Sequence, residues 1–207
     1  LLENINLITD ICHLSLISFA IASFDKTVKI CNSMTGTYGN VLQHDSPITK
    51  ICTNRSSFVT GCLNGTINVW NLSNKQCEKT FKAHDEAIRQ ICYIGEYLAS
   101  VSTNEKILKI WDPRSGECKK TIEVPYGIRA ICALDNGKFI TLDYTSEAKI
   151  WSSTHLLHEN SFYTTKSQFT NLAVLKDNTL ALLSSTGFEK TVEIWEEPNR
   201  YLETKTI

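Results

Sequence analysis

The side chains of this 207-residue chain that could do chemistry are mainly its eight cysteines, five histidines and 22 carboxylates. No CxxC pair with zinc-ligand spacing occurs. The motifs GxSxG, GxxxxGK[ST], HExxH and GxGxxG, which build nucleophile, phosphate, zinc and dinucleotide sites, are also missing. His155 and His158 form a loose pair that we interpret as exposed polar residues on a strand. We therefore predict no catalytic residue, no cofactor and no metal, and we do not expect an enzyme.

The cysteines instead mark a repeat. Four of them lie 40 residues apart and each follows an isoleucine: Cys12, Cys52, Cys92 and Cys132. Two more, Cys77 and Cys118, are 41 apart. Regular spacing of this kind is typical of equivalent positions in repeated units. We predict free thiols that fill small core positions in a reducing compartment.

A second repeated signal is a short apolar segment that ends in tryptophan in four of five copies. The copies are Val28–Cys31, Ile67–Trp70, Leu108–Trp111, Ala148–Trp151 and Val192–Trp195. Their last residues are 39, 41, 40 and 44 apart. Internal periods of this length indicate arrays, solenoids or propellers.

Each period divides into four short strands separated by turn residues. In the third period we expect them at Ile88–Tyr93, Tyr97–Val101, Leu108–Trp111 and Lys119–Ile122. No ten-residue segment has a helical apolar period, so the predicted fold class is all-β. We expect one domain, 1–207, with repeats near 5–43, 44–83, 84–124, 125–166 and 167–207. A lone four-stranded sheet buries too little apolar area, and radial packing of such sheets solves this.

His44 with the segment Thr60–Asn71, and His84 with Trp111-Asp112, resemble WD40 repeats. The resemblance implies a WD40-type β-propeller whose blades are pinned by a buried His, Ser/Thr, acid and Trp network. By position the members are His44, Thr60, Asn64 and Trp70 in repeat 2, and His84, Ser100 and Trp111 in repeat 3, with Asn104 or Glu105 as the acid. Every copy departs from the pattern somewhere, so we expect no complete network.

The number of repeats is low for the family that the chain resembles. The resemblance implies six to eight blades, and the sequence supplies about five. No spare strand is evident at either end to complete a shared blade. We therefore expect part of a larger ring rather than a complete five-bladed one.

The resemblance also places two sets of residues on one rim of the central channel. From these we select Phe24, Arg89, Arg129, Tyr144 and Phe188 as candidate partner-binding residues. Arg89 and Arg129 occupy equivalent positions in adjacent repeats and would suit a carboxylate or phosphate. The alternative is that both arginines are simply solvated, as most surface arginines are.

The charge balance, 21 Lys+Arg against 22 Asp+Glu, gives no strong nucleic-acid signal. No apolar stretch approaches membrane-spanning length, and we find no signal peptide. We expect a cytoplasmic protein-binding scaffold, with the nucleus as the alternative location. A narrower hypothesis is a substrate-recognition subunit of a ubiquitin ligase or signalling complex that binds acidic or phosphorylated peptides. Another is a structural subunit of a larger assembly.

Overall fold

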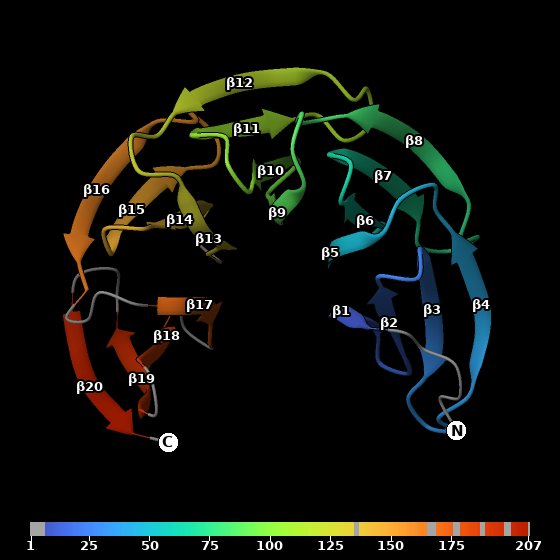
Figure 1. The fold of residues 1–207 in the computed structure, drawn as a ribbon, viewed down its shortest axis with the longest axis horizontal. Helices are drawn as coiled ribbons and strands as arrows, with labels where there is room; N and C mark the ends of the chain where they lie inside the picture. Colours follow the sequence, from blue (N-terminus) through green and yellow to red (C-terminus); the bar gives the residue numbers. More distant parts are fainter. Residues whose placement is uncertain are drawn as a thin grey trace.

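The computed structural model describes residues 7–134, 137–164, 169–175, 179–186, 189–196 and 200–206. Over these residues the chain forms five four-stranded antiparallel sheets, which confirms the all-β prediction. Figure 1 shows the sheets arranged in an arc, with one strand of each sheet near the centre and another on the outer wall. This is the arrangement of blades in a β-propeller.

Every blade consists of four consecutive strands, numbered from the centre outward. Blade 1 contains β1 (Ile8–Ser15), β2 (Ser18–Ser23), β3 (Thr27–Asn32) and β4 (Tyr38–Gln43). Blade 2 contains β5 (Ile48–Thr53), β6 (Ser57–Cys62), β7 (Thr66–Asn71) and β8 (Cys77–Lys82). Blade 3 contains β9 (Ile88–Ile94), β10 (Tyr97–Ser102), β11 (Ile107–Trp111) and β12 (Cys118–Glu123).

The last two blades follow the same order. Blade 4 contains β13 (Ile128–Ala133), β14 (Lys138–Asp143), β15 (Glu147–Ser152) and β16 (His158–Tyr163). Blade 5 contains β17 (Phe169–Val174), β18 (Leu180–Thr186), β19 (Glu189–Glu196) and β20 (Arg200–Thr206). The four strands predicted for the third repeat are confirmed, and each bound differs by at most one residue.

The hydrophobic cores lie between consecutive blades. Trp111 of blade 3, for example, packs in one cluster with Val59, Ile67 and Val69 of blade 2. The tryptophans of blades 2, 4 and 5 pack in the same way against the preceding blade. Substitution of a tryptophan buried in this way by alanine lowers the unfolding free energy by about 3–5 kcal/mol. These contacts therefore hold the blades together.

All eight cysteines are free thiols, as predicted, but Cys77 and Cys118 are exposed on the outer strands, so the prediction of core positions was wrong for these two. Burial raises the pKa of Cys12 to about 11, with Asp10 adding to the effect. Burial likewise raises the pKa of Cys92, to about 12. Because the thiolate is the reactive form, these thiols are poor nucleophiles at neutral pH.

The innermost strands contact one another in sequence order, β1 with β5, β5 with β9, β9 with β13 and β13 with β17. Figure 1 shows an opening between blades 1 and 5, and each sheet is built from its own four strands. Leu183, on the face of blade 5 that is turned away from blade 4, is 37% exposed, whereas its equivalents Val101 and Leu142 are each 1% exposed. The last blade therefore presents an apolar face that earlier blades bury.

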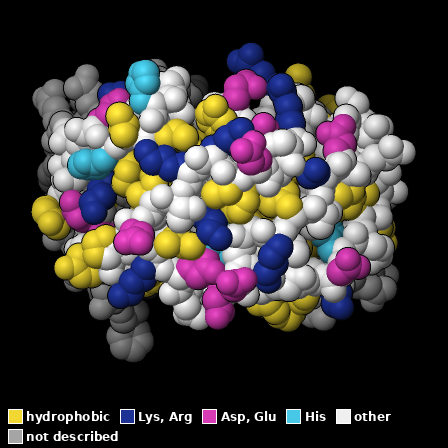
Figure 2. Space-filling model, turned by 90° about the horizontal axis from the view of Figure 1, so that it is seen from above, with side chains coloured by type: hydrophobic (Ala, Val, Ile, Leu, Met, Phe, Trp, Pro, Cys, Tyr) yellow, Lys and Arg dark blue, Asp and Glu magenta, His cyan; other side chains and the backbone are white. Residues whose placement is uncertain are grey.

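The outer wall mixes side chains of every type. On the side of the wall seen in Figure 2, cationic, acidic and hydrophobic groups are interspersed, without a large field of one sign. Such a surface does not favour non-specific binding to polyanions. The part of the chain that the structure describes contains no helix long and apolar enough to cross a bilayer.

Candidate functional site

Arg89, Tyr144 and Arg129 come together on the rim of blades 3 and 4. Each arginine is the second residue of an innermost strand, β9 or β13, and Tyr144 lies in the turn between β14 and β15. The guanidinium carbon of Arg89 lies 5.3 Å from the centre of the Tyr144 ring, and that of Arg129 lies 4.7 Å from it. Both distances allow a cation–π interaction. We call these three residues the Arg–Tyr–Arg cluster.

The turn that carries Tyr144 is held by its neighbour Asp143. One carboxylate oxygen of Asp143 accepts hydrogen bonds from the backbone N–H and hydroxyl of Thr145, at 2.8 and 2.7 Å, and from the backbone N–H of Glu147 at 3.0 Å. Ser146 adopts a left-handed conformation with φ 69°. Asp and Ser favour such turns because their short side chains bond the local backbone. The Tyr144 ring, 41% exposed, is therefore presented by a well-fixed turn.

The two arginines are not equivalent. Arg129 donates a hydrogen bond from Nη1 to the carbonyl of Phe169 in blade 5. Thr49, at the same position in blade 2, donates to the matching carbonyl of Ile88 at 2.7 Å. Arg89 makes no hydrogen bond or ion pair to any described residue. Arg129 thus joins two blades, while Arg89 is paired with Tyr144 alone.

Burial distinguishes this cluster from a pair of solvated arginines. Both arginines are half-buried, and the Nε atom of each is buried without a hydrogen-bond partner among the described residues. A buried unpaired N–H group costs free energy. The outer nitrogens of Arg89 are not buried and bond no described residue, so they are the donors that an acceptor from outside the chain can reach.

Phe24, another predicted rim residue, lies outside this cluster. Phe24 occupies the turn position of blade 1 that Tyr144 occupies in blade 4, and it is 41% exposed. Leu63 holds the same position in blade 2 and is 43% exposed. Phe188 falls outside the described residues. The structure thus assembles three of the five predicted residues.

The buried network is complete in blade 3, and the expectation that no copy would be complete was wrong. Ser100 Oγ lies 2.8 Å from His84 Nε2 and accepts a hydrogen bond from Trp111 Nε1 at 2.8 Å. His84 Nδ1 bonds the carboxylate of Glu105. That carboxylate also accepts from Ser102 Oγ and the backbone N–H of Asp85, each at 2.9 Å. Glu105, not Asn104, is the acid.

The pKa shifts of His84 and Glu105 indicate which of the two groups is charged. Burial lowers the pKa of His84, although Glu105 opposes the shift. Burial raises the pKa of Glu105, but hydrogen bonds from Asp85, His84 and Ser102 outweigh it, and the net pKa is lowered. His84 is then neutral at pH 7: it donates from Nδ1 to the Glu105 carboxylate, and Nε2 accepts from Ser100.

Blade 2 carries a shorter network, and Asn64 is not part of it. His44 Nε2 lies 2.8 Å from Thr60 Oγ1, which accepts from Trp70 Nε1 at 3.1 Å. Asn64 instead accepts hydrogen bonds from the hydroxyl and backbone N–H of Thr66, at 2.7 and 3.2 Å. Burial lowers the pKa of His44 to about 4, while the Leu42 carbonyl and Asp45 oppose the shift.

The tryptophans of blades 4 and 5 each donate one hydrogen bond. In blade 4, Trp151 Nε1 donates to Thr141 Oγ1 at 2.8 Å. In blade 5, Trp195 Nε1 donates to Glu193, whose side chain is buried and lies two residues earlier on the same strand. Glu193 was not predicted from the sequence. The available signal was an acidic residue on the same face of the strand as Trp195, a face that the alternation predicts to be buried. These networks stiffen the blades, and the described residues hold no group of three side chains arranged to bind a metal.

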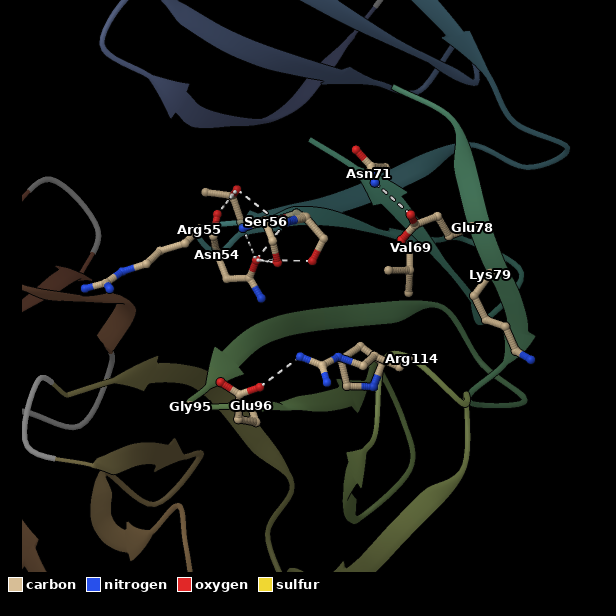
Figure 3. A pocket seen from close by; sticks show the side chains of 13 residues that line it. Asn54, Arg55, Ser56, Val69, Asn71, Glu78, Lys79, Gly95, Glu96 and Arg114 are labelled. Atoms are coloured by element: carbon tan, nitrogen blue, oxygen red, sulfur yellow. Dashed lines mark hydrogen bonds and ion pairs between the residues drawn. The ribbon is translucent and has the colours of Figure 1, made fainter. Parts of the chain in front are cut away.

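A cleft of about 710 Å³ between blades 2 and 3 is a second feature that the sequence did not predict. The turns β5–β6, β9–β10 and β11–β12 line it, together with β8. Figure 3 shows these turns around the cleft. They lie at the strand ends opposite to the β14–β15 turn that carries Tyr144. The cleft and the Arg–Tyr–Arg cluster therefore occupy opposite faces.

Comparison with known proteins agrees with this architecture. The family model described as "WD domain, G-beta repeat" (WD40) matches residues 36–71 and 75–112. The DDB1- and CUL4-associated factor 13 of Danio rerio is 30% identical over 115 residues. This match covers 51% of this chain and 25% of the relative.

Two fungal proteins match comparable stretches. The nuclear distribution protein PAC1 of Candida dubliniensis is 26% identical over 109 residues, which cover 49% of this chain and 22% of PAC1. The COMPASS component SWD3 of Saccharomyces cerevisiae is 26% identical over 107 residues, which cover 50% of this chain and 34% of SWD3. The matches thus span between about a fifth and a third of these relatives. Together with the five stacked sheets and the His–Ser–Trp network, they show that this chain is a WD40-repeat β-propeller protein.

Proposed function

We propose that this chain is a non-catalytic scaffold for protein–protein interaction, and that the Arg–Tyr–Arg cluster binds an acidic or phosphorylated segment of a partner. The observation that carries the proposal is the state of Arg89. Its guanidinium stacks on Tyr144 and has no acceptor among the described residues. A fixed guanidinium with free donors is suited to bidentate contact with a carboxylate or phosphate.

The surroundings of Arg89 lower the entropic cost of binding. Tyr144 restrains the guanidinium from one side, and the Asp143 turn restrains Tyr144 in its place. Arg129 bonds the next blade, so the second arginine is also fixed. Side chains ordered before binding lose less rotamer freedom when a ligand arrives.

The names of the relatives support the scaffold and suggest a narrower role. One is an associated factor and another a component of a complex, which are the roles of proteins that assemble other proteins. The factor named for DDB1 and CUL4 fits the hypothesis of a substrate-recognition subunit of a ubiquitin ligase. This narrower role rests on that likeness, whereas the rim site rests on the geometry of this chain.

The test compares matched variants in a partner capture experiment. The wild type, Arg89→Gln, Tyr144→Leu and Lys138→Gln are used as baits, and captured proteins are quantified by mass spectrometry. Lys138, which begins β14 at the end opposite to the β14–β15 turn and does not line the cleft, serves as the control. A rim partner should be lost with the first two variants, kept with Lys138→Gln, and displaced by an acidic or phosphorylated peptide from its own sequence. If Arg89→Gln captured every partner that the wild type captures, the proposal would be contradicted.

The exposed face of blade 5 favours a second candidate function, a structural subunit of a larger assembly. Leu175 and Leu183 are 47% and 37% exposed there, whereas their equivalents in blade 4, Leu134 and Leu142, are 6% and 1% exposed. Contiguous exposed apolar side chains mark association surfaces. Sedimentation analysis tests this: the wild type should associate as its concentration rises, and Leu183→Lys should sediment as a monomer. A wild type that stays monomeric would rule out self-association on this face.

A further inference from the structure

The cleft between blades 2 and 3 carries an uneven set of charges. Three cationic side chains line it, Arg55, Lys79 and Arg114, against two carboxylates, Glu78 and Glu96. Figure 3 shows Arg55 and Lys79 toward the two ends and Arg114 between them. The cleft is thus locally cationic, although the whole chain has a net charge of −1.

The two carboxylates already have partners. Glu78 accepts a hydrogen bond from the amide of Asn71 at 2.7 Å. Glu96 pairs with Arg114 at 3.3 Å, and both of these side chains are highly exposed, at 84% and 87%. An ion pair this exposed contributes little, so another carboxylate can replace Glu96 at small cost.

Two of the cations have no partner. The side chains of Arg55 and Lys79 make no hydrogen bond or ion pair within the described part of the chain, and both are exposed. Two unpaired cations thus flank the cleft, extending outward from its two ends, and one weakly paired arginine lies between them (Figure 3). The complementary ligand carries several negative charges along its length.

The wall beneath Arg55 is rigid. Asn54 Oδ1 accepts hydrogen bonds from the backbone N–H groups of Ser56 and Ser57, at 2.9 and 2.8 Å. The hydroxyl of Ser57 lies 2.7 Å from that of Tyr93, which joins this turn of blade 2 to blade 3. The backbone of the cleft is therefore formed before any ligand binds, which reduces the entropy lost on binding.

The lining also restricts the class of ligand. It contains no aromatic side chain, and its apolar members are Val69 and Pro113. Nucleobases bind through stacking on aromatic rings, and apolar small molecules need hydrophobic walls. Serine, threonine and asparagine side chains, by contrast, suit the peptide groups of an extended polypeptide.

We infer that this cleft is a second docking site, which binds an extended acidic segment of a partner protein through Arg55, Lys79 and Arg114. It lies on the face opposite to the Arg–Tyr–Arg cluster and does not depend on that site. A scaffold with both sites holds two acidic segments at once, one on each face.

The test uses a fluorescein-labelled peptide of eight glutamates as the probe, measured by anisotropy with the full chain. Arg55→Glu and Lys79→Glu should each weaken binding about fivefold, since each places a carboxylate against the peptide. Glu96→Gln should tighten binding about twofold to fivefold, because it frees Arg114. Lys106→Glu makes the same charge change as Lys79→Glu at an exposed site on the opposite face and should have less than about a twofold effect.

Glu96→Gln removes an exposed charge and leaves the fold intact, so its result does not depend on refolding. Equal weakening by Lys106→Glu would mean diffuse attraction and would overturn the inference. So would Glu96→Gln without any tightening. A single-stranded oligonucleotide of twelve thymidines that binds more tightly than the peptide would assign the cleft to nucleic acid instead. Measured in an Arg89→Gln background, which weakens the rim site, the effects of Arg55→Glu, Lys79→Glu and Glu96→Gln should persist, which separates this site from the rim.

Discussion

The guanidinium carbon of Arg129 lies 4.7 Å from the centre of the Tyr144 ring, in the same blade. The same ring lies 5.3 Å from the guanidinium carbon of Arg89 in the preceding blade. One aromatic side chain therefore holds two cations that would otherwise repel each other. The contact connects the rim of blade 3 to that of blade 4.

Replacement of Tyr144 by leucine should destabilise the protein by about 1–2 kcal/mol, since each cation–π contact contributes about 0.5–1 kcal/mol. Tyr144→Phe keeps the ring and should change the unfolding free energy by less than about 0.5 kcal/mol. Urea unfolding followed by tryptophan fluorescence measures both variants. If phenylalanine is as costly as leucine, the hydroxyl and not the ring face is the stabilising group.

The shared hydroxyl of the buried network gives a second prediction. Thr60→Val keeps the shape of the side chain but leaves both His44 Nε2 and Trp70 Nε1 without a partner. Each unpaired buried group costs about 1–3 kcal/mol, so a loss of about 2–6 kcal/mol is expected for the two groups.

Thr141→Val is the matched control, because the Thr141 hydroxyl bonds Trp151 and no second side chain among the described residues. It should cost about 1–2 kcal/mol. Chemical denaturation midpoints give the comparison. Equal costs for the two substitutions would show that His44 contributes nothing to the network.

Gly65 is expected to be intolerant of any side chain. Its φ is +79°, and an added Cβ would lie 2.0 Å from the carbonyl oxygen of His84 and 2.6 Å from that of Glu86. Both neighbours are backbone atoms of the chain entering blade 3, so the clash cannot be relieved by a rotamer change. Gly65→Ala should lower stability by more than about 3 kcal/mol.

Gly36 provides the control for backbone strain alone. Its φ is +69°, and nothing lies within 4 Å of the place that an added Cβ would occupy. Gly36→Ala should cost about 1–2 kcal/mol, the usual penalty of a left-handed alanine. Thermal unfolding of both variants separates the two effects, and a Gly65→Ala midpoint as high as that of Gly36→Ala would refute the close approach.

The stability of the protein should fall as the pH drops from about 6.5 to about 4. Burial lowers the pKa of His44 from 6.5 to about 4 in the folded state, and it lowers that of His84 as well. The unfolded chain therefore binds protons in this window that the folded chain does not. Linkage then reduces the unfolding free energy by up to about 1.4 kcal/mol per pH unit for each histidine.

Urea unfolding at several pH values between about 7.5 and about 4.5, chosen to bracket the window, measures this slope. His44→Gln removes one titrating group and should flatten the dependence, while the stability at the upper end of the range falls because the bond to Thr60 is altered. A slope that does not change in His44→Gln would mean that this histidine is already protonated in the folded state.

The repeat could be found from sequence because its signals are local. The 40-residue cysteine period, the tryptophan at the end of the third strand and the alternation in Ile88–Tyr93 each reflect which face of a strand is buried. They predicted five sets of four strands, and the structure has them. The equivalent positions of Arg89 and Arg129 followed from the same period.

The identity of the acid in blade 3 could not be settled in this way. An extra residue in the β10–β11 turn left Asn104 and Glu105 as alternatives, and only the orientation of the turn places Glu105 against His84. Asn64 fits the sequence pattern, yet its side chain bonds Thr66 instead. Side-chain direction within a turn depends on backbone angles that the residue types do not specify.

The sequence alone determined the period, the strand order within each blade and the residues that pack between blades, since these depend on hydrophobic alternation along a single chain. The tertiary structure decided which distant residues meet. Tyr144 contacts Arg89, which comes 55 residues earlier in the chain, and Arg129, which comes 15 residues earlier. The cleft joins turns of two blades. Such contacts depend on the distance and angle between neighbouring sheets, which are set by packing and not by any local pattern.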